Sequence, residues 1–216
     1  MMKCRVIDME TYPRKAHFEH FLSMAYPYVG VTVNVEVTDL VRLCRERGWS
    51  FFTVFLHAAC LAADRVEQFR HRIRDGGVIE YEACPSSHTE LKEDGTYCYC
   101  TLHHHMPLAD YLAQAEKQRE ACRKNGSIEE DDDVESMYFI TCLPWLHYTA
   151  LIQPAACGEE SNPRISWGRY EEDAKGRLMM PVTVLVHHSL ADGVHIGSFY
   201  SNLDTEIAKI LKEAAG

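Results

Sequence analysis

Residues 178–210 constrain the fold of this chain more than any other stretch. They open with Leu178–Val186, an uncharged run of mainly apolar and β-branched residues, which predicts a strand buried on both faces. Five apolar residues then recur at three- and four-residue spacing, as on one face of an amphipathic helix: Ile196, Phe199, Leu203, Ile207 and Ile210. A buried strand therefore leads into a helix through the short segment His187–Gly193.

That segment carries two imidazoles, His187 and His188, and the carboxylate of Asp192. Imidazole titrates near neutral pH and can take a proton from an alcohol or a thiol. The alternative is structural, with both histidines satisfied in the core and Asp192 acting only as the N-cap of the helix. The strand, turn and helix context favours the catalytic interpretation. Because successive strand residues point to opposite faces, the two rings are expected to diverge.

Composition limits the class of protein. The 216 residues, 46% of them apolar, are enough for one sizeable core, and no linker divides them, so we expect a single domain over residues 1–216. The net charge of −10 argues against a nucleic-acid or anionic-membrane partner, and no apolar run is long enough to span a bilayer. The nine cysteines are irregularly spaced and no signal segment precedes them, so we expect reduced thiols and a cytoplasmic location.

Turn and periodicity signals predict helices alternating with strands along the rest of the chain. Helices are expected from Pro13, and over 38–48, 51–66 (capped by Ser50) and 107–124. Strands are expected near the start, over 29–37, beside hairpin turns at 75–77 and 93–95, and over 137–142, 146–152, 164–170 and 178–186. The acidic run 129–133 and the connection 154–163 are expected to be loops. The fold class is then α/β, a two-layer sandwich of a mixed, mostly antiparallel sheet covered by helices.

A histidine triplet, His103–His105, raises the question of a metal site. If the triplet lies on a strand, adjacent side chains point to opposite faces and cannot all reach one ion. A polar strand end or loop is therefore the favoured interpretation, and no metal is expected. The sequence also lacks the Cys-x-x-Cys, His-Glu-x-x-His and Gly-x-Ser-x-Gly patterns of other catalytic and metal sites.

The order His187-His188-x-x-x-Asp192-Gly193 resembles the HHxxxDG signature of chloramphenicol acetyltransferases and of the catalytic domains of dihydrolipoamide acyltransferases. Three further segments, Pro13–Glu19, Leu143–Leu146 and Arg177–Pro181, are similar to the chloramphenicol acetyltransferase pattern in order and approximate spacing. The chain also has the length of a whole subunit of that family. The resemblance therefore covers nearly all of it and implies the two-layer fold of these enzymes.

The resemblance implies a coenzyme A-dependent acyltransferase with acetyl-CoA as co-substrate. His188 would be the general base, and Asp192 would pair with Arg14 and hold the turn that orients His188. The acceptor would attack the thioester directly, without a covalent enzyme intermediate. The resemblance further implies a homotrimer with active sites at the subunit interfaces and a small-molecule acceptor.

Other site residues implied by the resemblance depart from the family pattern. The serine that donates to the tetrahedral oxyanion corresponds to Ala150, beside Thr149, while Ser166 stands where the family has a threonine hydroxyl. In the acceptor pocket the corresponding residues are Phe21, Val29 and Tyr97; near coenzyme A they are Arg169, Tyr170 and Phe52. The acceptor pocket is thus more changed than the catalytic turn.

Three readings of the function follow. The first is acetyl transfer to a hydroxyl of chloramphenicol or another small alcohol, and the second is acyl transfer to a different amine or thiol acceptor. The third is a catalytically weak member of the family that acts as a binding protein, which the alanine at position 150 favours. A dihydrolipoamide acyltransferase is disfavoured, because no lipoyl or linker segment is found in this chain.

Overall fold

The computed structural model describes residues 2–129, 133–155 and 160–215. The acidic run 129–133 and the connection 154–163 lie partly outside these residues. Five α-helices are present in the described part: α1 (Lys15–Leu22), α2 (Thr38–Arg47), α3 (Phe51–Asp64), α4 (Leu108–Asn125) and α5 (Gly193–Ala215). Two short 3₁₀ turns, η1 (Glu67–Phe69) and η2 (Val134–Ser136), lie between α3 and the next strand and before a later strand.

The strands form two sheets. The larger has the order β2 (Tyr28–Glu36), β10 (Leu178–His187), β8 (Arg164–Gly168), β7 (Tyr138–Leu143), β5 (Ser86–Leu91) and β6 (Tyr97–Leu102), and the short β9 (Glu171–Glu172) also pairs with β10. The pairs β5–β7 and β7–β8 are parallel and the others antiparallel. The smaller sheet has the order β1 (Cys4–Val6), β4 (Gly77–Tyr81) and β3 (His71–Arg74).

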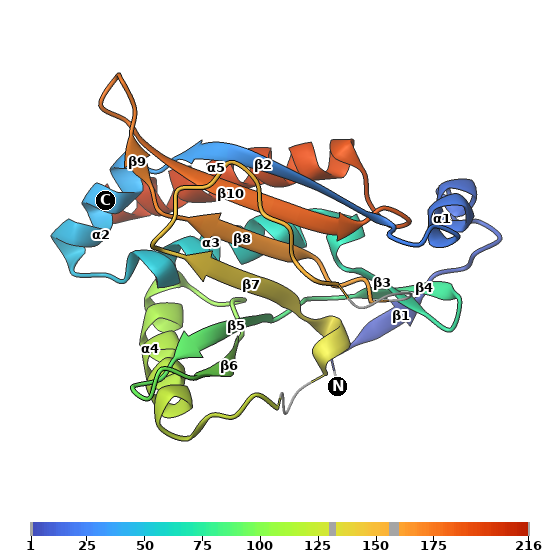
Figure 1. The fold of residues 1–216 in the computed structure, drawn as a ribbon, viewed down its shortest axis with the longest axis horizontal. Helices are drawn as coiled ribbons and strands as arrows, with labels where there is room; N and C mark the ends of the chain where they lie inside the picture. Colours follow the sequence, from blue (N-terminus) through green and yellow to red (C-terminus); the bar gives the residue numbers. More distant parts are fainter. Residues whose placement is uncertain (1, 130–132, 156–159, 216) are drawn as a thin grey trace.

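Strand β10 lies inside the larger sheet and is covered on both faces, as its uncharged sequence predicts. Val182, Val184 and Val186 join the main core with α3 and α5, which lie together on one face (Figure 1). The irregular connection after β7 crosses the other face, where the Thr183 hydroxyl donates to the Tyr148 hydroxyl over 3.3 Å. The mixed, mostly antiparallel sheet with helices against it confirms the predicted fold class.

Local sequence signals explain several boundaries. The Ser50 side chain accepts from the Thr53 amide over 3.4 Å at the start of α3, as expected of its N-cap. Gly48, at φ 66°, ends α2 in the left-handed conformation. The β3–β4 hairpin turns through Asp75 and Gly76 at φ 51° and 71°, the backbone that this turn sequence predicts.

The strand predicted over 146–152 is wrong. Pro144 follows β7 directly and has no amide hydrogen to continue the ladder, and the chain turns there, with the Leu146 amide donating to the Leu143 carbonyl over 3.1 Å. Beyond the turn no strand forms, and Trp145, Leu146 and Ile152 are 67%, 54% and 90% exposed. The apolar alternation in this segment therefore reflects exposed side chains and not a half-buried strand.

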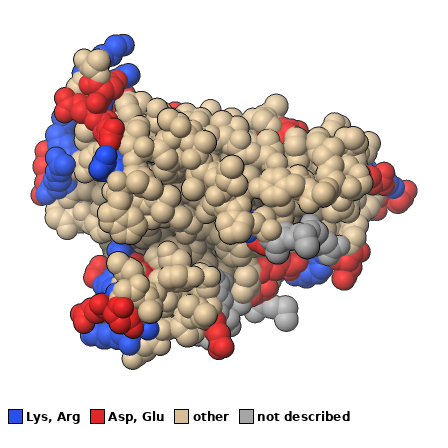
Figure 2. All heavy atoms as spheres, viewed as in Figure 1, with Lys and Arg blue, Asp and Glu red and all other residues tan. Residues whose placement is uncertain are grey.

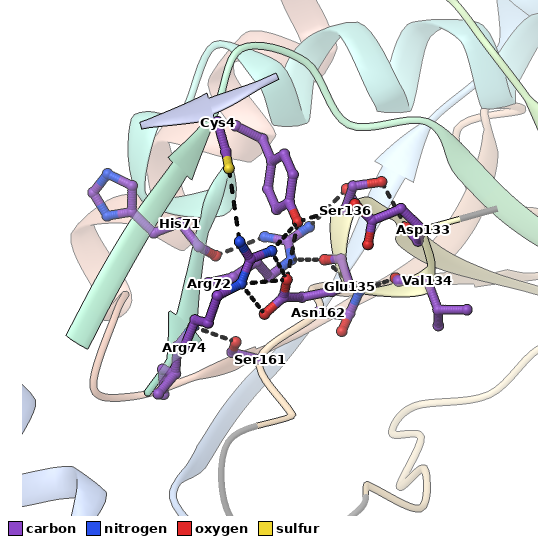
Figure 3. Close-up of polar contacts among 12 residues, drawn as sticks. Cys4, His71, Arg72, Arg74, Asp133, Val134, Glu135, Ser136, Ser161 and Asn162 are labelled. Carbon is purple, nitrogen blue, oxygen red and sulfur yellow. Dashed lines mark hydrogen bonds and ion pairs between the residues drawn. The ribbon is translucent and has the colours of Figure 1, made fainter. Parts of the chain in front are cut away.

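A fully buried arginine joins the smaller sheet to the larger one. The Arg72 guanidinium, on β3, donates to the backbone carbonyls of Phe69, His71, Glu135, Ser136 and Met137 over 2.7–3.3 Å. Figure 3 shows His71, Glu135 and Ser136 around this side chain, with Asn162 adding hydrogen bonds to the same η2 backbone. Carbonyl oxygens, not a carboxylate, thus satisfy this buried cation.

Candidate active site

The segment after β10 forms a tight turn fixed by backbone hydrogen bonds. The His188 amide donates to the Pro27 carbonyl over 2.7 Å, while the amides of Leu190 and Ala191 donate to the His187 carbonyl over 3.0 and 3.1 Å. The turn is therefore held both to itself and to the segment leading into β2. Its histidines and Asp192 keep a fixed position at the end of the sheet.

The imidazole of His188 is oriented for proton transfer. Its Nδ1 lies 3.1 Å from the Ala191 carbonyl, and because a carbonyl only accepts, Nδ1 carries the proton and donates it. Nε2 is then left with its lone pair, the form that a general base requires. The Phe21 ring stacks on the imidazole at 3.7 Å between centroids and 8° between planes. Phe21 thus contacts the predicted base itself.

The ion pair implied by the resemblance is present. Arg14, just before α1, donates through Nη1 to Asp192 Oδ2 over 2.6 Å, and both side chains are partly buried. The Asp192 carboxylate also accepts from the Val194 amide over 3.0 Å, so the residue caps α5 as well. Burial raises the pKa of Asp192, but the Arg14 hydrogen bond and the nearby His195 outweigh burial and hold this pKa at about 2.

The other histidine of the signature has a different environment. His187 is the last residue of β10 and is 1% exposed. Its Nδ1 accepts from the Ser189 amide over 3.3 Å, and its ring meets Tyr28 edge-on at 5.2 Å. The expected divergence of the two rings is observed, with His187 in the interior and His188 half-buried at the turn.

A cavity of about 520 Å³ lies elsewhere on the larger sheet, beside β5, β6 and β7. Its lining combines apolar side chains with polar and charged ones: Ser87, His88, Thr89, Tyr99, Ile128, Val134, Phe139, Ile140, Thr141, Gln153, Pro154 and Arg164. Gln153 and Thr141 form a polar floor of this cavity, with the buried Ser166 behind them. The Ser166 hydroxyl donates to Gln153 Oε1, and Gln153 Nε2 donates to the Thr141 hydroxyl, both over 3.0 Å.

The sequence prediction named none of the lining residues of this cavity. It named Tyr97, whereas Tyr99, two residues on and on the same face of β6, lines the cavity. The alternation in β6 indicated the correct face but not which tyrosine lies over the cavity. Gln153 and Thr141 carried no signal, because their pairing with Ser166 joins segments that only the fold brings together.

The predicted base, His188, and the predicted acceptor-site residue Ser166 lie far apart within one chain. Ser166 pairs with Thr183 on β10, and His188 follows Thr183 by five residues, so they are separated by about 17 Å of extended strand. Thr149 and Ala150 lie exposed in the connection after β7. Val29 stands near the base, opposite Val186 in the ladder between β2 and β10.

The residues predicted to contact coenzyme A lie at the far end of β8. Glu171, next to Tyr170, pairs with Met179, which places this group about 30 Å from His188 along β10. Arg169 is exposed and paired with Glu171 over 2.5 Å, and the Tyr170 ring meets Phe51 at 5.6 Å. Phe52 packs inward, with its ring 5.5 Å from that of Trp167. Their role in cofactor binding stays a prediction.

The histidine triplet does not lie on a strand, so the argument from strand alternation does not hold for it. Strand β6 ends at Leu102, so His104 and His105 lie in an irregular segment where strand alternation does not hold. Both Nε2 atoms approach Asp64 Oδ2, at 2.6 and 2.7 Å. Two of the three side chains therefore do converge on one point.

Comparison with known proteins decides the family. The model of the family "Chloramphenicol acetyltransferase" matches residues 2–204. The chain belongs to this family. Among its relatives, the chloramphenicol acetyltransferase of Proteus mirabilis is 22% identical over 200 residues, covering 92% of each chain. Chloramphenicol acetyltransferase 2 of Escherichia coli is 22% identical over 214 residues, covering 95% of this chain and 98% of its own.

Solved structures agree with this assignment. A chloramphenicol acetyltransferase superposes with a TM-score of 0.87 at 25% identity, covering 95% of this chain and all of its own. The dihydrolipoamide acetyltransferase of Azotobacter vinelandii, at a TM-score of 0.63 and 17% identity, covering 90% of this chain and 86% of its own, shares the fold. Within the described residues of this family member, no helix combines the length and apolarity needed to cross a membrane.

Proposed function

We propose that this member of the chloramphenicol acetyltransferase family transfers an acetyl group from acetyl-CoA to a hydroxyl of a small molecule, with His188 as general base. The observation that carries the proposal is the hydrogen bond from His188 Nδ1 to the Ala191 carbonyl. In the neutral imidazole, that bond leaves the lone pair on Nε2 and fixes its direction. The resemblance at the signature and the family match support the same reaction.

The reaction follows from that geometry. Nε2 of His188 takes the proton of the acceptor hydroxyl as its oxygen attacks the thioester carbonyl, which forms a tetrahedral oxyanion. Collapse of the oxyanion breaks the carbon–sulfur bond, and the coenzyme A sulfur leaves with the proton returned by the imidazolium. Asp192 pairs with Arg14 and caps α5, so it supports the turn and takes no proton.

We propose that each active site is shared by two copies of the chain. One chain holds the base and the cavity floor about 17 Å apart along the sheet, so the cavity of a neighbour must supply the acceptor site. Figure 2 supports a face for such a neighbour, because Lys, Arg, Asp and Glu gather around the rim and leave a broad uncharged area. Trp145 and Ile152 are strongly exposed apolar residues of the connection after β7.

A contact between two different surfaces of the same chain is heterologous and forms a closed ring when the rotation permits. The resemblance implies a ring of three. Each copy then presents its His188 turn to one neighbour and its cavity to the other. The mixed apolar and polar lining of the cavity, with Ser166 hydrogen-bonded behind Gln153 and Thr141, fits a small acceptor that carries both apolar groups and hydroxyls.

Activity of single variants tests the chemistry. His188→Ala should lose almost all acetyl transfer from acetyl-CoA to chloramphenicol or to the best acceptor of an alcohol panel, with an unchanged circular dichroism spectrum. The matched control is His103→Ala, which removes an exposed imidazole remote from the turn and should keep full activity. Comparable turnover by His188→Ala would remove the base assignment.

Mixed assemblies test the shared site. Chains with His188→Ala and chains with Ser166→Ala are each expected to be nearly inactive, and refolding them together should restore part of the activity, since some interfaces then combine an intact base with an intact cavity. No recovery, in mixed oligomers shown by mass spectrometry to form, would place both groups in one chain.

The alternative function is that of a binding protein. Ala150 offers no hydroxyl where the family has its oxyanion donor, and this observation favours weak catalysis. Acceptor binding by calorimetry together with no turnover across the acceptor panel would establish it.

A further inference from the structure

A cluster of three metal-binding side chains lies outside the proposed active site. Asp64 is the last residue of α3, and His104 and His105 lie in the segment that connects β6 to α4. One ligand atom from each of the three residues lies within 4.8 Å of the other two. The signature at 187–193 and the cavity beside β5–β7 use none of these residues.

The geometry resembles that of a set of converging ligands. Nε2 of His104 and Nε2 of His105 lie 2.6 and 2.7 Å from the same oxygen, Asp64 Oδ2. The two rings are 4.5 Å apart between centroids and tilted by 33°, so both present Nε2 to one point. His104 is fully buried, and its Nδ1 has no hydrogen-bond partner in the described part of the chain, so this ring is held by Asp64 alone.

We propose that Asp64, His104 and His105 bind one divalent transition-metal ion of the zinc class. Two imidazole nitrogens and one carboxylate oxygen are ligands that Zn²⁺ accepts, with a fourth position left for water. Metal–ligand distances of about 2.0–2.2 Å separate ligands by slightly more than the present contacts, so the three side chains need to move apart by less than about 1 Å. His105 is half exposed and gives the ion a route from solvent.

Surrounding hydrogen bonds orient this set. The Tyr138 hydroxyl donates to Asp64 Oδ1 over 2.8 Å, which leaves Oδ2 directed at the histidines. His57 Nε2 donates to the backbone carbonyls of His104 and Met106 over 3.1 and 3.2 Å and fixes the segment that carries both imidazoles. The Arg70 cation nearby is paired with Glu80 over 2.9 Å, so its repulsion of an ion is offset. The ion would tie the end of α3 to the segment before α4.

A second cluster, Glu67, His71 and Glu80, is less suited to a cation. Glu80 already forms ion pairs with Arg5 and Arg70, at 2.5 and 2.9 Å, and a metal ion would have to displace one of them. His71 approaches Glu67 only to 3.6 Å. Metal binding is therefore expected at Asp64 and not at this second cluster.

Titration of the metal-free full-length protein with Co²⁺ and Zn²⁺ tests the proposal. Wild type should bind one Co²⁺ per chain with the visible absorption of a low-coordinate ion, and Zn²⁺ should displace it. Zn²⁺ at about 100-fold its dissociation constant should raise the melting temperature by about 5 °C. His105→Gln keeps a donor for Asp64 but removes the imidazole, and should weaken binding at least about tenfold.

His103→Ala is the matched control, since it removes an adjacent, exposed histidine outside the cluster and should bind as wild type does. Tyr138→Phe removes only the hydrogen bond to Asp64 and should weaken binding about 10–100-fold, which provides a second variant if His105→Gln does not fold. The proposal is overturned if wild type binds less than one ion, if His105→Gln binds as tightly as wild type, or if His103→Ala loses the site. None of these readouts depends on acetyl transfer.

Discussion

At the scale of single residues, the turn after β10 gives the two nitrogens of the His188 imidazole different roles. His188 donates from Nδ1 to the carbonyl of Ala191, three residues on in the same turn, and Phe21 covers its ring face. The orientation of the base therefore depends on the turn being formed and on Phe21 from α1. The oxyanion side is predicted to be weaker, because Ala150 has no side-chain donor.

We expect Ala150→Ser to raise the turnover number for chloramphenicol or another accepted alcohol at least about tenfold, with a smaller change in KM. A restored hydroxyl would act on charge that develops only in the transition state, where one lost donor costs about 10²–10³-fold in other enzymes. Steady-state kinetics of the single variant give the answer. Thr149→Ala is the control: if it abolishes activity in the wild-type background while Ala150→Ser adds nothing, Thr149 already supplies the donor.

The acid dependence of stability should report on Asp192. Its pKa in the folded protein, about 2, is below the ordinary 3.8, so the carboxylate stabilises the fold at pH values above the ordinary pKa and loses this contribution as the pH falls from about 4 to 2. Asp192→Asn should be less stable than wild type at pH 6, and the difference should shrink toward pH 2. A difference that stays constant across this range, in urea unfolding followed by fluorescence, would contradict the ion-pair explanation.

At the scale of elements, the sequence predicted what depends on neighbours along the chain. The strand, turn and helix of residues 178–210, the Ser50 cap and the Asp75–Gly76 hairpin are all local patterns, and the structure has each of them. The prediction over 146–152 was wrong because a strand needs a partner, and Pro144 turns the chain away from one. For the same reason the sequence could not show that Tyr99 and not Tyr97 lines the cavity. The cavity also involves Ile128 and other residues remote in sequence.

The joint at Arg72 should be sensitive to loss of its guanidinium. Arg72→Met keeps much of the volume but removes the guanidinium from buried carbonyls of η1, β3 and η2, among them Phe69 and Ser136, and each orphaned group costs about 1–3 kcal/mol. We expect the free energy of unfolding to fall by about 3 kcal/mol or more. The matched control is Arg42→Met on α2, an exposed arginine paired with Asp39, whose effect should stay within about 0.5 kcal/mol. Equal losses in the two variants, by chemical denaturation, would show that the Arg72 contacts add nothing.

At the scale of the whole molecule, the parts of the proposed site are distributed and not gathered. The base lies at one end of β10, the cavity beside β7 and the predicted coenzyme A contacts beyond the far end of β8. The family signature predicted His188 as the base, but no periodicity in the sequence could show that Ser166 lies about 17 Å from it along the sheet. This distance is set by the register between β8 and β10, which pairs Ser166 with Thr183.

An acidic side chain in the exposed connection after β7 should break the proposed assembly. Ile152→Glu places a charge where Ile152 is 90% exposed in the single chain, and burial of that charge against a neighbour would be unfavourable. We expect a lower mass by analytical ultracentrifugation and a parallel loss of acetyl transfer. Val6→Glu, at an equally exposed apolar residue of the smaller sheet, should change neither. An Ile152→Glu protein with wild-type mass would exclude this part of the connection from the interface.

The backbone carbonyls that accept from Arg72 also affect which part of the protein should unfold first in acid. Carbonyl oxygens take up no proton at any pH at which the chain is studied, so this joint keeps its hydrogen bonds while carboxylates are being neutralised. The opposite is true at the turn, where α1 is held to α5 through a carboxylate. Amide exchange near pH 2, where Asp192 takes up its proton, should therefore accelerate first in α1 and the start of α5, with β3 and β7 still protected.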